Sequence, residues 1–222
     1  MSEQLSTVEV ETGHAPATSI IWLHGLGADG HDFEPIVPQL AGAIAGPARF
    51  VLPHAPMRPV TINGGMVMRA WFDIFGIDRR IRQDEAGIRT SAESAAALIR
   101  RENERGIPSE RIVLAGFSQG GAVALHAGLR NPERLAGIIG LSTALPVGHS
   151  VAAEASEANA RTPILLAHGK LDPVLPFALG TASRDALRAL GYDVTWHEYD
   201  MPHAVCPQEI ADISRWLARV LS

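Results

Sequence analysis

Short, mostly apolar runs rich in β-branched residues recur along this 222-residue chain and alternate with longer segments of helical periodicity. Continuous apolar runs of this kind are typical of strands that are buried on both faces of a sheet. Their alternation with helical segments predicts an α/β protein with a mostly parallel central sheet and helices on both faces. The six predicted strands are residues 19–23, 49–52, 112–115, 135–141, 163–167 and 194–199.

Other segments complete the predicted domain. Apolar residues recur at helical spacing in residues 84–101 and 207–221, whereas residues 5–11 alternate apolar and polar residues as an exposed antiparallel edge strand does. Residues 54–82, rich in Pro, Gly and Met, show no clear periodicity, and we interpret them as an insertion that lines the crevice at the carboxyl ends of the strands. We therefore expect a single domain, 1–222, with no large lid domain.

A serine stands at the junction of a predicted strand and a helical pattern. The motif Gly-Phe-Ser-Gln-Gly places Ser118 between Gly116 and Gly120, directly after the strand at 112–115. This strand-turn-helix setting is typical of a nucleophile elbow, in which glycines permit a sharp, strained turn. The following helix N-terminus can stabilise a developing oxyanion. Ser142 also follows an apolar strand but lacks the second glycine, so we assign it no nucleophilic role.

A serine hydroxyl needs a base, which is usually a histidine oriented by a carboxylate. His203 lies in a loop between the last predicted strand and the last predicted helix, so it leaves the same end of the sheet as Ser118. We predict His203 as the base. The other four histidines after Ser118 have structural positions: His126 within a helix, His149 in a polar loop, His168 in a turn where it hydrogen-bonds its own loop, and His197 within a strand.

Two aspartates compete for the role of the acid. Asp172 follows the strand at 163–167, whereas Asp200 stands three residues before His203. The elbow-type hydrolases take their triad in the order Ser, Asp or Glu, His from successive strand ends. Chain order therefore favours Asp172, and we interpret Asp200 as a solvated or capping carboxylate.

The oxyanion hole requires two N–H donors. One is expected from Gln119, the residue after the nucleophile, and the other from an early strand-end loop. Leu26 lies in such a loop, between Gly25 and Gly27, which let the backbone turn inward.

Composition excludes several other classes. A formal net charge of -5 without basic clusters argues against nucleic acid or an anionic membrane as partners, and no segment is long and apolar enough to insert into a membrane. Cys206 is the only cysteine, which we interpret as a core residue rather than a thiol nucleophile. His24, Asp29 and His31 lack a recurrent ligand spacing, so we expect no metal and no cofactor. With no leader segment in the first twenty residues, we expect a cytoplasmic protein.

Five linked motifs carry a family resemblance. They stand in the order LHGLGADGHDFEPIVPQL, LPHAPMRPVTINGGMVMRAWFDI, GFSQGGAVAL, HGKLDPVLP and MPHAVCPQEI. Together they closely resemble the bacterial carboxylesterases of the phospholipase/carboxylesterase family, which includes the acyl-protein thioesterases, over nearly the whole chain from about Ser19. The resemblance implies an α/β-hydrolase fold, cofactor-free hydrolysis of carboxylic esters and often thioesters, a triad of Ser118, Asp172 and His203, and oxyanion donors on Leu26 and Gln119. Pro202 and Ala204 depart from the frequent Gly and Ser of the family without touching the triad.

We therefore expect a serine hydrolase that cleaves esters of short to medium acyl chains, and thioesters, through an acyl-enzyme. Apolar side chains of the insertion are expected to bind the substrate: Met66, Met68, Trp71 and Phe72. The expected partners of the protein are a small-molecule ester or thioester, or an acylated protein. The sequence leaves open whether the chain is a monomer or a homodimer. The alternative is a non-catalytic receptor of the same fold, since fold alone does not imply turnover.

Overall fold

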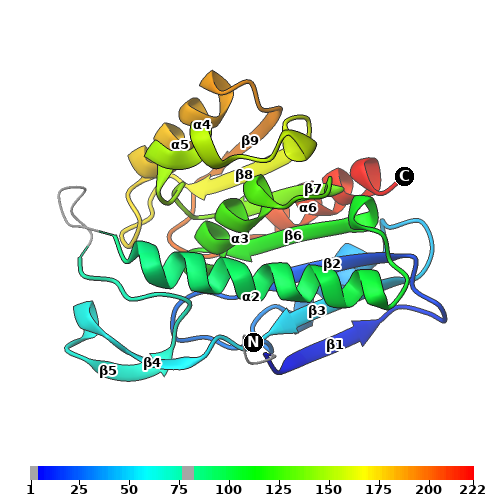
Figure 1. Cartoon of the computed structure of the whole chain (residues 1–222), viewed down its shortest axis with the longest axis horizontal. Helices are drawn as coiled ribbons and strands as arrows, with labels where there is room; N and C mark the ends of the chain where they lie inside the picture. Colours follow the sequence, from blue (N-terminus) through cyan, green and yellow to red (C-terminus); the bar gives the residue numbers. More distant parts are fainter. Residues whose placement is uncertain (1–4, 77–82) are drawn as a thin grey trace.

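The central sheet has seven strands in the order β1-β3-β2-β6-β7-β8-β9 (Figure 1). The computed structural model describes residues 5–76 and 83–222. At one edge β1 pairs antiparallel with β3, and the other neighbouring strands pair parallel. The strands are β1 (Thr7–Glu11), β2 (Thr18–Leu23), β3 (Ala48–Pro53), β6 (Ile112–Phe117), β7 (Gly137–Leu141), β8 (Ile164–Gly169) and β9 (Val194–Tyr199).

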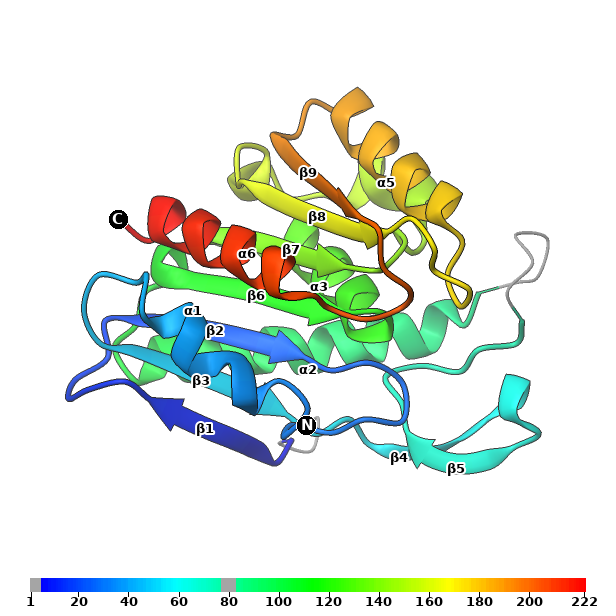
Figure 2. The same ribbon diagram turned by 180° about the vertical axis from the view of Figure 1, so that it is seen from behind.

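Helices cover both faces of this sheet because successive side chains of a buried strand point to opposite faces. In β2, Ile21 and Leu23 join the core beneath α2, α3 and α5, whereas Ile20 and Trp22 join the core beneath α1 and α6. Figure 1 is seen from the side of α2, α3 and α5, and Figure 2 from the side of α1 and α6. The helices are α1 (Val37–Ala41), α2 (Glu85–Glu104), α3 (Gln119–Arg130), α4 (Val151–Glu154), α5 (Phe177–Ala189) and α6 (Pro207–Val220). Short 3₁₀ turns lie at Glu34–Ile36, Thr61–Asn63, Ser109–Arg111, Gly148–Ser150 and Glu157–Asn159.

The predicted fold class is confirmed. All six predicted strands are present with small shifts at their ends, and the segment predicted as an edge strand forms the antiparallel β1. The helices predicted at 84–101 and 207–221 are α2 and α6. Asp84 caps α2, since its side chain accepts a hydrogen bond from the Gly87 N–H.

The segment 54–82 contains regular structure that its lack of periodicity does not predict. Strands β4 (Met57–Val60) and β5 (Met66–Arg69) form an antiparallel hairpin beside the main sheet (Figures 1 and 2). Gly64 and Gly65 both have positive φ in the turn and follow Asn63, so the Asn-Gly turn signal was present in the sequence. Four-residue strands are too short for alternation to stand out. Residues 77–82 of this segment lie outside the described residues.

Parallel pairing places the carboxyl ends of β2, β6, β8 and β9 at the same end of the sheet, so the loops that follow these strands meet there. These loops and the first residue of α3, Gln119, hold every residue that the sequence predicts for the triad and the oxyanion hole. Within the described part of the chain, no helix is long and apolar enough to cross a bilayer.

Candidate active site

Ser118 occupies a strained turn between β6 and α3. Its φ of 53° and ψ of -117° lie outside the regions that L-residues favour. A Cβ at Gly116 would lie 2.3 Å from the backbone of Gly120, and a Cβ at Gly120 would lie 2.3 Å from Leu23 O. The glycines that flank the serine are therefore required by close backbone packing.

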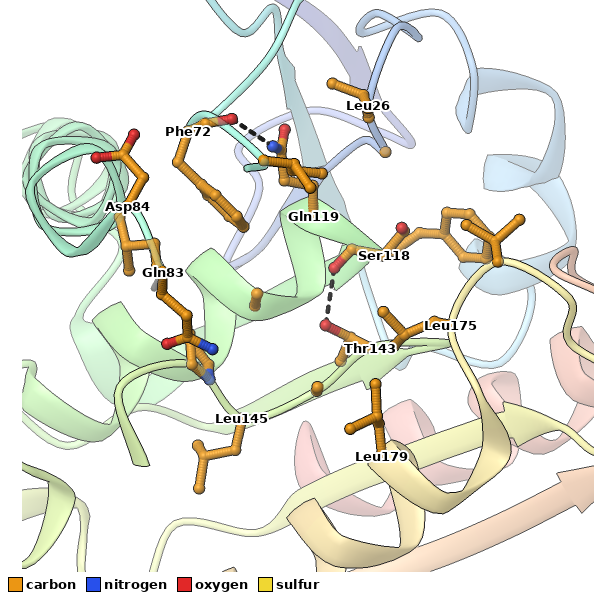
Figure 3. Close-up of a pocket in the computed structure, with 18 of the residues that line it drawn as sticks. Leu26, Phe72, Gln83, Asp84, Ser118, Gln119, Thr143, Leu145, Leu175 and Leu179 are labelled. Carbon is orange, nitrogen blue, oxygen red and sulfur yellow. Dashed lines mark hydrogen bonds between the residues drawn. The ribbon is translucent and has the colours of Figure 1, made fainter. Parts of the chain in front are cut away.

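Hydrogen bonds hold the backbone of this turn in place. The Ser118 N–H donates to Leu141 O at 2.8 Å. Its carbonyl accepts from the Ala122 N–H at 3.1 Å and from Thr143 Oγ1 at 2.7 Å (Figure 3). The hydroxyl Oγ of Ser118 has no hydrogen-bond partner among residues 5–76 and 83–222, so these contacts fix the main chain and leave the hydroxyl free to react.

Asp172 and His203 form a tight pair from the loops after β8 and β9. His203 Nδ1 donates to Asp172 Oδ2 at 2.6 Å, and the Asp172 side chain is fully buried. The second carboxylate oxygen, Oδ1, accepts from the backbone N–H groups of Val174 and Leu175 at 2.9 and 2.8 Å. These bonds hold the carboxylate, which in turn keeps the proton of His203 on Nδ1 and leaves Nε2 as the basic atom.

Asp200, the competing acid, points elsewhere. Its side chain is 80% exposed and pairs with Lys170 at 2.6 Å. The structure thus brings Asp172, and not Asp200, to His203.

Ser118 and His203 line the same pocket. The ring of His203 packs against the Phe117 ring, with their centroids 4.8 Å apart, so the residue before the serine holds the imidazole from the side. Across the part of the chain that the structure describes, His203 Nε2 has no hydrogen-bond partner, since the bond to Asp172 is made by Nδ1. Geometry therefore leaves this nitrogen available to the Ser118 hydroxyl, a contact that is often loose in free enzymes.

Two backbone N–H groups without acceptors lie beside the serine. Leu26 and Gln119 both line the pocket, and neither amide has a hydrogen-bond acceptor among the described residues. Gln119 begins α3, where the first N–H groups have no partner within the helix and the helix dipole is positive. The pair is suited to bind a negatively charged oxygen.

The Gln119 side chain has a separate role that the sequence did not indicate. Its Oε1 accepts from the Trp71 N–H at 2.8 Å, and its Nε2 donates to Phe72 O at 2.6 Å (Figure 3). Through these two bonds, the first turn of α3 holds Trp71 and Phe72 next to the residue that follows Ser118.

The other four histidines that follow Ser118 in the sequence do not line the pocket. Burial lowers the pKa of His126 to about 4, so it stays neutral inside α3. His149 is exposed and His197 half-buried, and they pair only loosely with acidic side chains, at 4.0 and 3.9 Å. His168 is fully buried and hydrogen-bonds Leu175 O of the following loop at 2.9 Å, as predicted, but it lies within β8 and not in a turn.

His168 also touches the acid, which the sequence did not indicate. Its Nε2 lies 3.4 Å from Asp172 Oδ2. Because Leu175 O only accepts, Nε2 carries the proton, and the N–H faces the carboxylate as well. Burial lowers the pKa of His168, so the ring supports Asp172 as a neutral group.

The pocket itself has a volume of about 810 Å³ and mostly apolar walls. Figure 3 shows Phe72 on one side and Leu145, Leu175 and Leu179 on the other, with Ser118 between them. The walls come from the segment after β5, the start of α2, one face of α5 and the loops after β2, β7 and β8.

The predicted substrate-binding residues need correction. Phe72 lines the pocket, but Met66, Met68 and Trp71 are not among the residues that line it. Met66 is 63% exposed on the hairpin, and Met68 Sδ accepts from Asn63 Nδ2. Trp71 is fully buried, and its indole Nε1–H is satisfied there by donating to the backbone carbonyl of His24 at 2.9 Å.

Other side chains supply the lining that sequence reasoning missed. From the insertion the pocket takes Ile62, Ile74 and Phe75, and from α5 it takes Leu179. The sequence could have indicated Leu179, because α5 follows the carboxyl end of β8, and ligands bind at the carboxyl ends of strands in open α/β sheets.

The structure also shows where the candidate metal ligands, the cysteine and the second strand-end serine lie. Among residues 5–76 and 83–222, no three His, Cys, Asp or Glu side chains gather as metal ligands do. Cys206 is partly buried and packs against the core on the α6 side of the sheet. Ser142 is fully buried and lies outside the pocket.

Comparison with known proteins agrees with this geometry. A family model described as phospholipase/carboxylesterase matches residues 5–221. Acyl-protein thioesterase 1 of Neurospora crassa is 43% identical over 212 residues, which span 91% of this chain and 86% of that protein. Among solved structures, acyl-protein thioesterase 2 of Zea mays aligns with a TM-score of 0.85 at 31% identity, covering 98% of this chain and 99% of that one. SOBER1 of Arabidopsis thaliana aligns with a TM-score of 0.86 at 33% identity, covering 92% and 99%. This chain thus belongs to the phospholipase/carboxylesterase family and is a carboxylesterase-type hydrolase with the α/β-hydrolase fold.

Proposed function

We propose that Ser118, His203 and Asp172 act as a catalytic triad that hydrolyses carboxylic esters and thioesters through an acyl-enzyme. One observation carries the proposal: a hydrogen bond of 2.6 Å to the buried Asp172 orients His203, and His203 lines the same pocket as Ser118, a half-buried serine in a strained backbone conformation. No structural need explains a serine in that backbone conformation, since its hydroxyl bonds to nothing among the described residues.

The geometry supports a two-step acyl transfer. His203 Nε2 takes the proton of Ser118 Oγ as the oxygen attacks the substrate carbonyl, and the backbone N–H groups of Leu26 and Gln119 bind the resulting oxyanion. The imidazolium, stabilised by Asp172, returns the proton to the leaving alcohol or thiol. Water then repeats the sequence on the acyl-Ser118 ester and releases the acid.

The apolar pocket is the proposed site of the acyl chain. Its volume of about 810 Å³ is within the range that holds a drug-sized ligand, and its walls between Phe72 and Leu179 carry few polar groups. We infer substrates with short to medium acyl chains, either small esters or proteins that carry a thioester-linked acyl group. The names of the acyl-protein thioesterases described above support the second class.

A chain-length series tests the placement of the acyl group. We expect kcat/KM to peak at medium chains in a series of p-nitrophenyl esters and in a series of S-acyl-cysteine peptides. Leu179→Trp should fill the pocket and move the optimum to shorter chains, whereas Ala189→Trp, at the far end of the same helix, should not. An optimum unchanged by Leu179→Trp would place the acyl chain elsewhere.

A rapid-mixing experiment tests turnover itself. The acyl-enzyme mechanism predicts a burst of nitrophenol with an amplitude near one equivalent, provided that deacylation is the slower step. Binding of the ester without release of nitrophenol would favour the non-catalytic receptor instead.

Three expectations stay predictions. A cytoplasmic location is testable by fractionation and a homodimer by sedimentation. Membership of the bacterial subgroup also stays a prediction, because the curated relative described above is fungal.

A further inference from the structure

The peptide group between Gly25 and Leu26 is held by a buried histidine. His24 is 1% exposed, and its Nδ1 lies 2.7 Å from Gly25 O while its Nε2 lies 3.0 Å from the Ala55 N. A carbonyl only accepts and a backbone N–H only donates, so Nδ1 carries the proton and Nε2 is bare. The neighbouring groups therefore select one neutral tautomer of His24.

Holding this carbonyl also directs the N–H of Leu26. The Gly25 carbonyl and the Leu26 N–H belong to one planar trans peptide group, in which they point in opposite directions. Gly25 O accepts from His24 Nδ1 and also from the Ala28 N–H at 3.3 Å, so donors fix the oxygen side. The N–H is then aimed away from His24, and among the described residues it meets no acceptor.

The peptide lies next to the nucleophile. A Cβ built on Gly25 would be 3.6 Å from the Ser118 Cβ and 3.2 Å from the Phe117 ring. Hydrogen bonding to a peptide carbonyl also polarises the peptide and strengthens its N–H as a donor. The His24 Nδ1–H, which is the nearer of the two donors to Gly25 O, thus contributes to both the orientation and the polarity of the Leu26 N–H.

A second set of contacts fixes His24 itself. Its carbonyl accepts from the Trp71 indole N–H at 2.9 Å, and the two rings pack with centroids 5.3 Å apart. The Trp71 backbone N–H in turn donates to the side chain of Gln119, whose own backbone supplies the other oxyanion donor. One buried cluster of His24, Trp71 and Gln119 therefore connects both donors.

We propose that His24 is a positioning residue, which orients and polarises the Gly25–Leu26 peptide so that the Leu26 N–H binds the oxyanion. The inference rests on the proposed function and deepens it. Loss of an oxyanion-hole donor lowers kcat about 10²- to 10³-fold in other hydrolases. We expect loss of the His24 Nδ1 proton to lower kcat about 10²-fold and to change KM little, since the oxyanion forms only in the transition state.

A matched pair of variants tests this role. In His24→Asn the amide Nδ2 occupies the place of Nδ1 and can still donate to Gly25 O. In His24→Gln the longer side chain fills more of the ring's volume and can reach the Ala55 N–H, but its amide lies at the place of Nε2. The positioning role predicts that His24→Asn keeps kcat within about tenfold while His24→Gln loses about 10²-fold. A role in packing alone predicts the reverse order.

Affinity for a trifluoromethyl ketone gives a second readout, because its adduct with Ser118 carries an oxyanion. Its affinity should fall in parallel with kcat in His24→Gln, while the affinity for the carboxylic acid product stays within about threefold. If both His24 variants fail to fold, Trp71→Phe keeps the ring and removes the indole N–H that donates to His24 O. It should lower kcat and ketone affinity together, and unchanged values would overturn the proposal.

Labelling by a fluorophosphonate separates the two levels. Failure of the wild-type protein to react at Ser118 would reject the proposed function. Reaction of the wild type together with equal or reversed effects of His24→Asn and His24→Gln would reject only the role of His24.

Discussion

Replacing Asp172 by Asn is expected to abolish most activity while leaving the fold intact. Asp172 Oδ1 accepts two backbone N–H groups, from Val174 and Leu175, so in the variant the amide oxygen must remain on that side. The Asn NH₂ then faces His203 Nδ1, where the carboxylate oxygen stood at 2.6 Å. A donor at that place forces the histidine proton onto Nε2, so the atom that should take the Ser118 proton is already protonated.

The size of the loss follows from this tautomer reversal. The same substitution in serine proteases keeps the geometry and lowers kcat about 10⁴-fold. A 10⁴-fold loss corresponds to about 5.4 kcal/mol of barrier, at roughly 1.36 kcal/mol per tenfold. Stability should change much less, because both bonds to the loop amides are kept.

The assay is kcat/KM for p-nitrophenyl butyrate beside the thermal midpoint of each variant. Asp200→Asn is the matched control, since the Asp200 side chain is 80% exposed and its pair with Lys170 lies at the surface. We expect it to stay within about twofold of the wild type, because exposed ion pairs contribute little. A loss below tenfold in folded Asp172→Asn, or a larger loss in Asp200→Asn, would refute the tautomer argument.

Two further predictions concern stability. Burial raises the pKa of Glu209 to about 8, although the Cys206 N–H favours its charged form, so the folded chain holds a proton that the unfolded chain loses above its ordinary pKa. The contribution of this bound proton to the free energy of unfolding is full below pH 4.5 and is lost as pH rises through about 8, by up to a few kcal/mol. In urea unfolding, the free energy of unfolding should therefore depend less on pH in Glu209→Gln than in the wild type. Gly120→Ala should destabilise by at least about 1–3 kcal/mol, because its Cβ would lie 2.3 Å from Leu23 O. Gly42→Ala, with its nearest contact at 3.6 Å, should unfold like the wild type in the same assay, and equal midpoints for the two variants would contradict the packing argument.

The strands and the meeting of the triad residues were predictable from the sequence. Buried parallel strands are continuous apolar runs, and the glycines around Ser118 follow from a close approach of backbones. Once the strands are placed, parallel topology brings Asp172 and His203 to the same end of the sheet as the serine. Those inferences need only local pattern and chain order.

The pocket lining was not predictable in the same way. Trp71 is buried with its indole N–H bonded to the carbonyl of His24, a contact across 47 positions that no local pattern indicates. Met66 and Met68 lie on a hairpin whose placement against the sheet depends on tertiary contacts. The sequence does not indicate the role of His24, because its hydrogen bond to Gly25 O depends on the orientation of the ring.

The most direct test of the central claim is the mass of the protein after reaction with a fluorophosphonate. The account predicts one phosphonyl group per chain, located at Ser118 by peptide mapping, with labelling lost in Ser118→Ala and strongly slowed in Asp172→Asn. Labelling that persists in Ser118→Ala, or that maps to another residue, would contradict the assignment of the nucleophile.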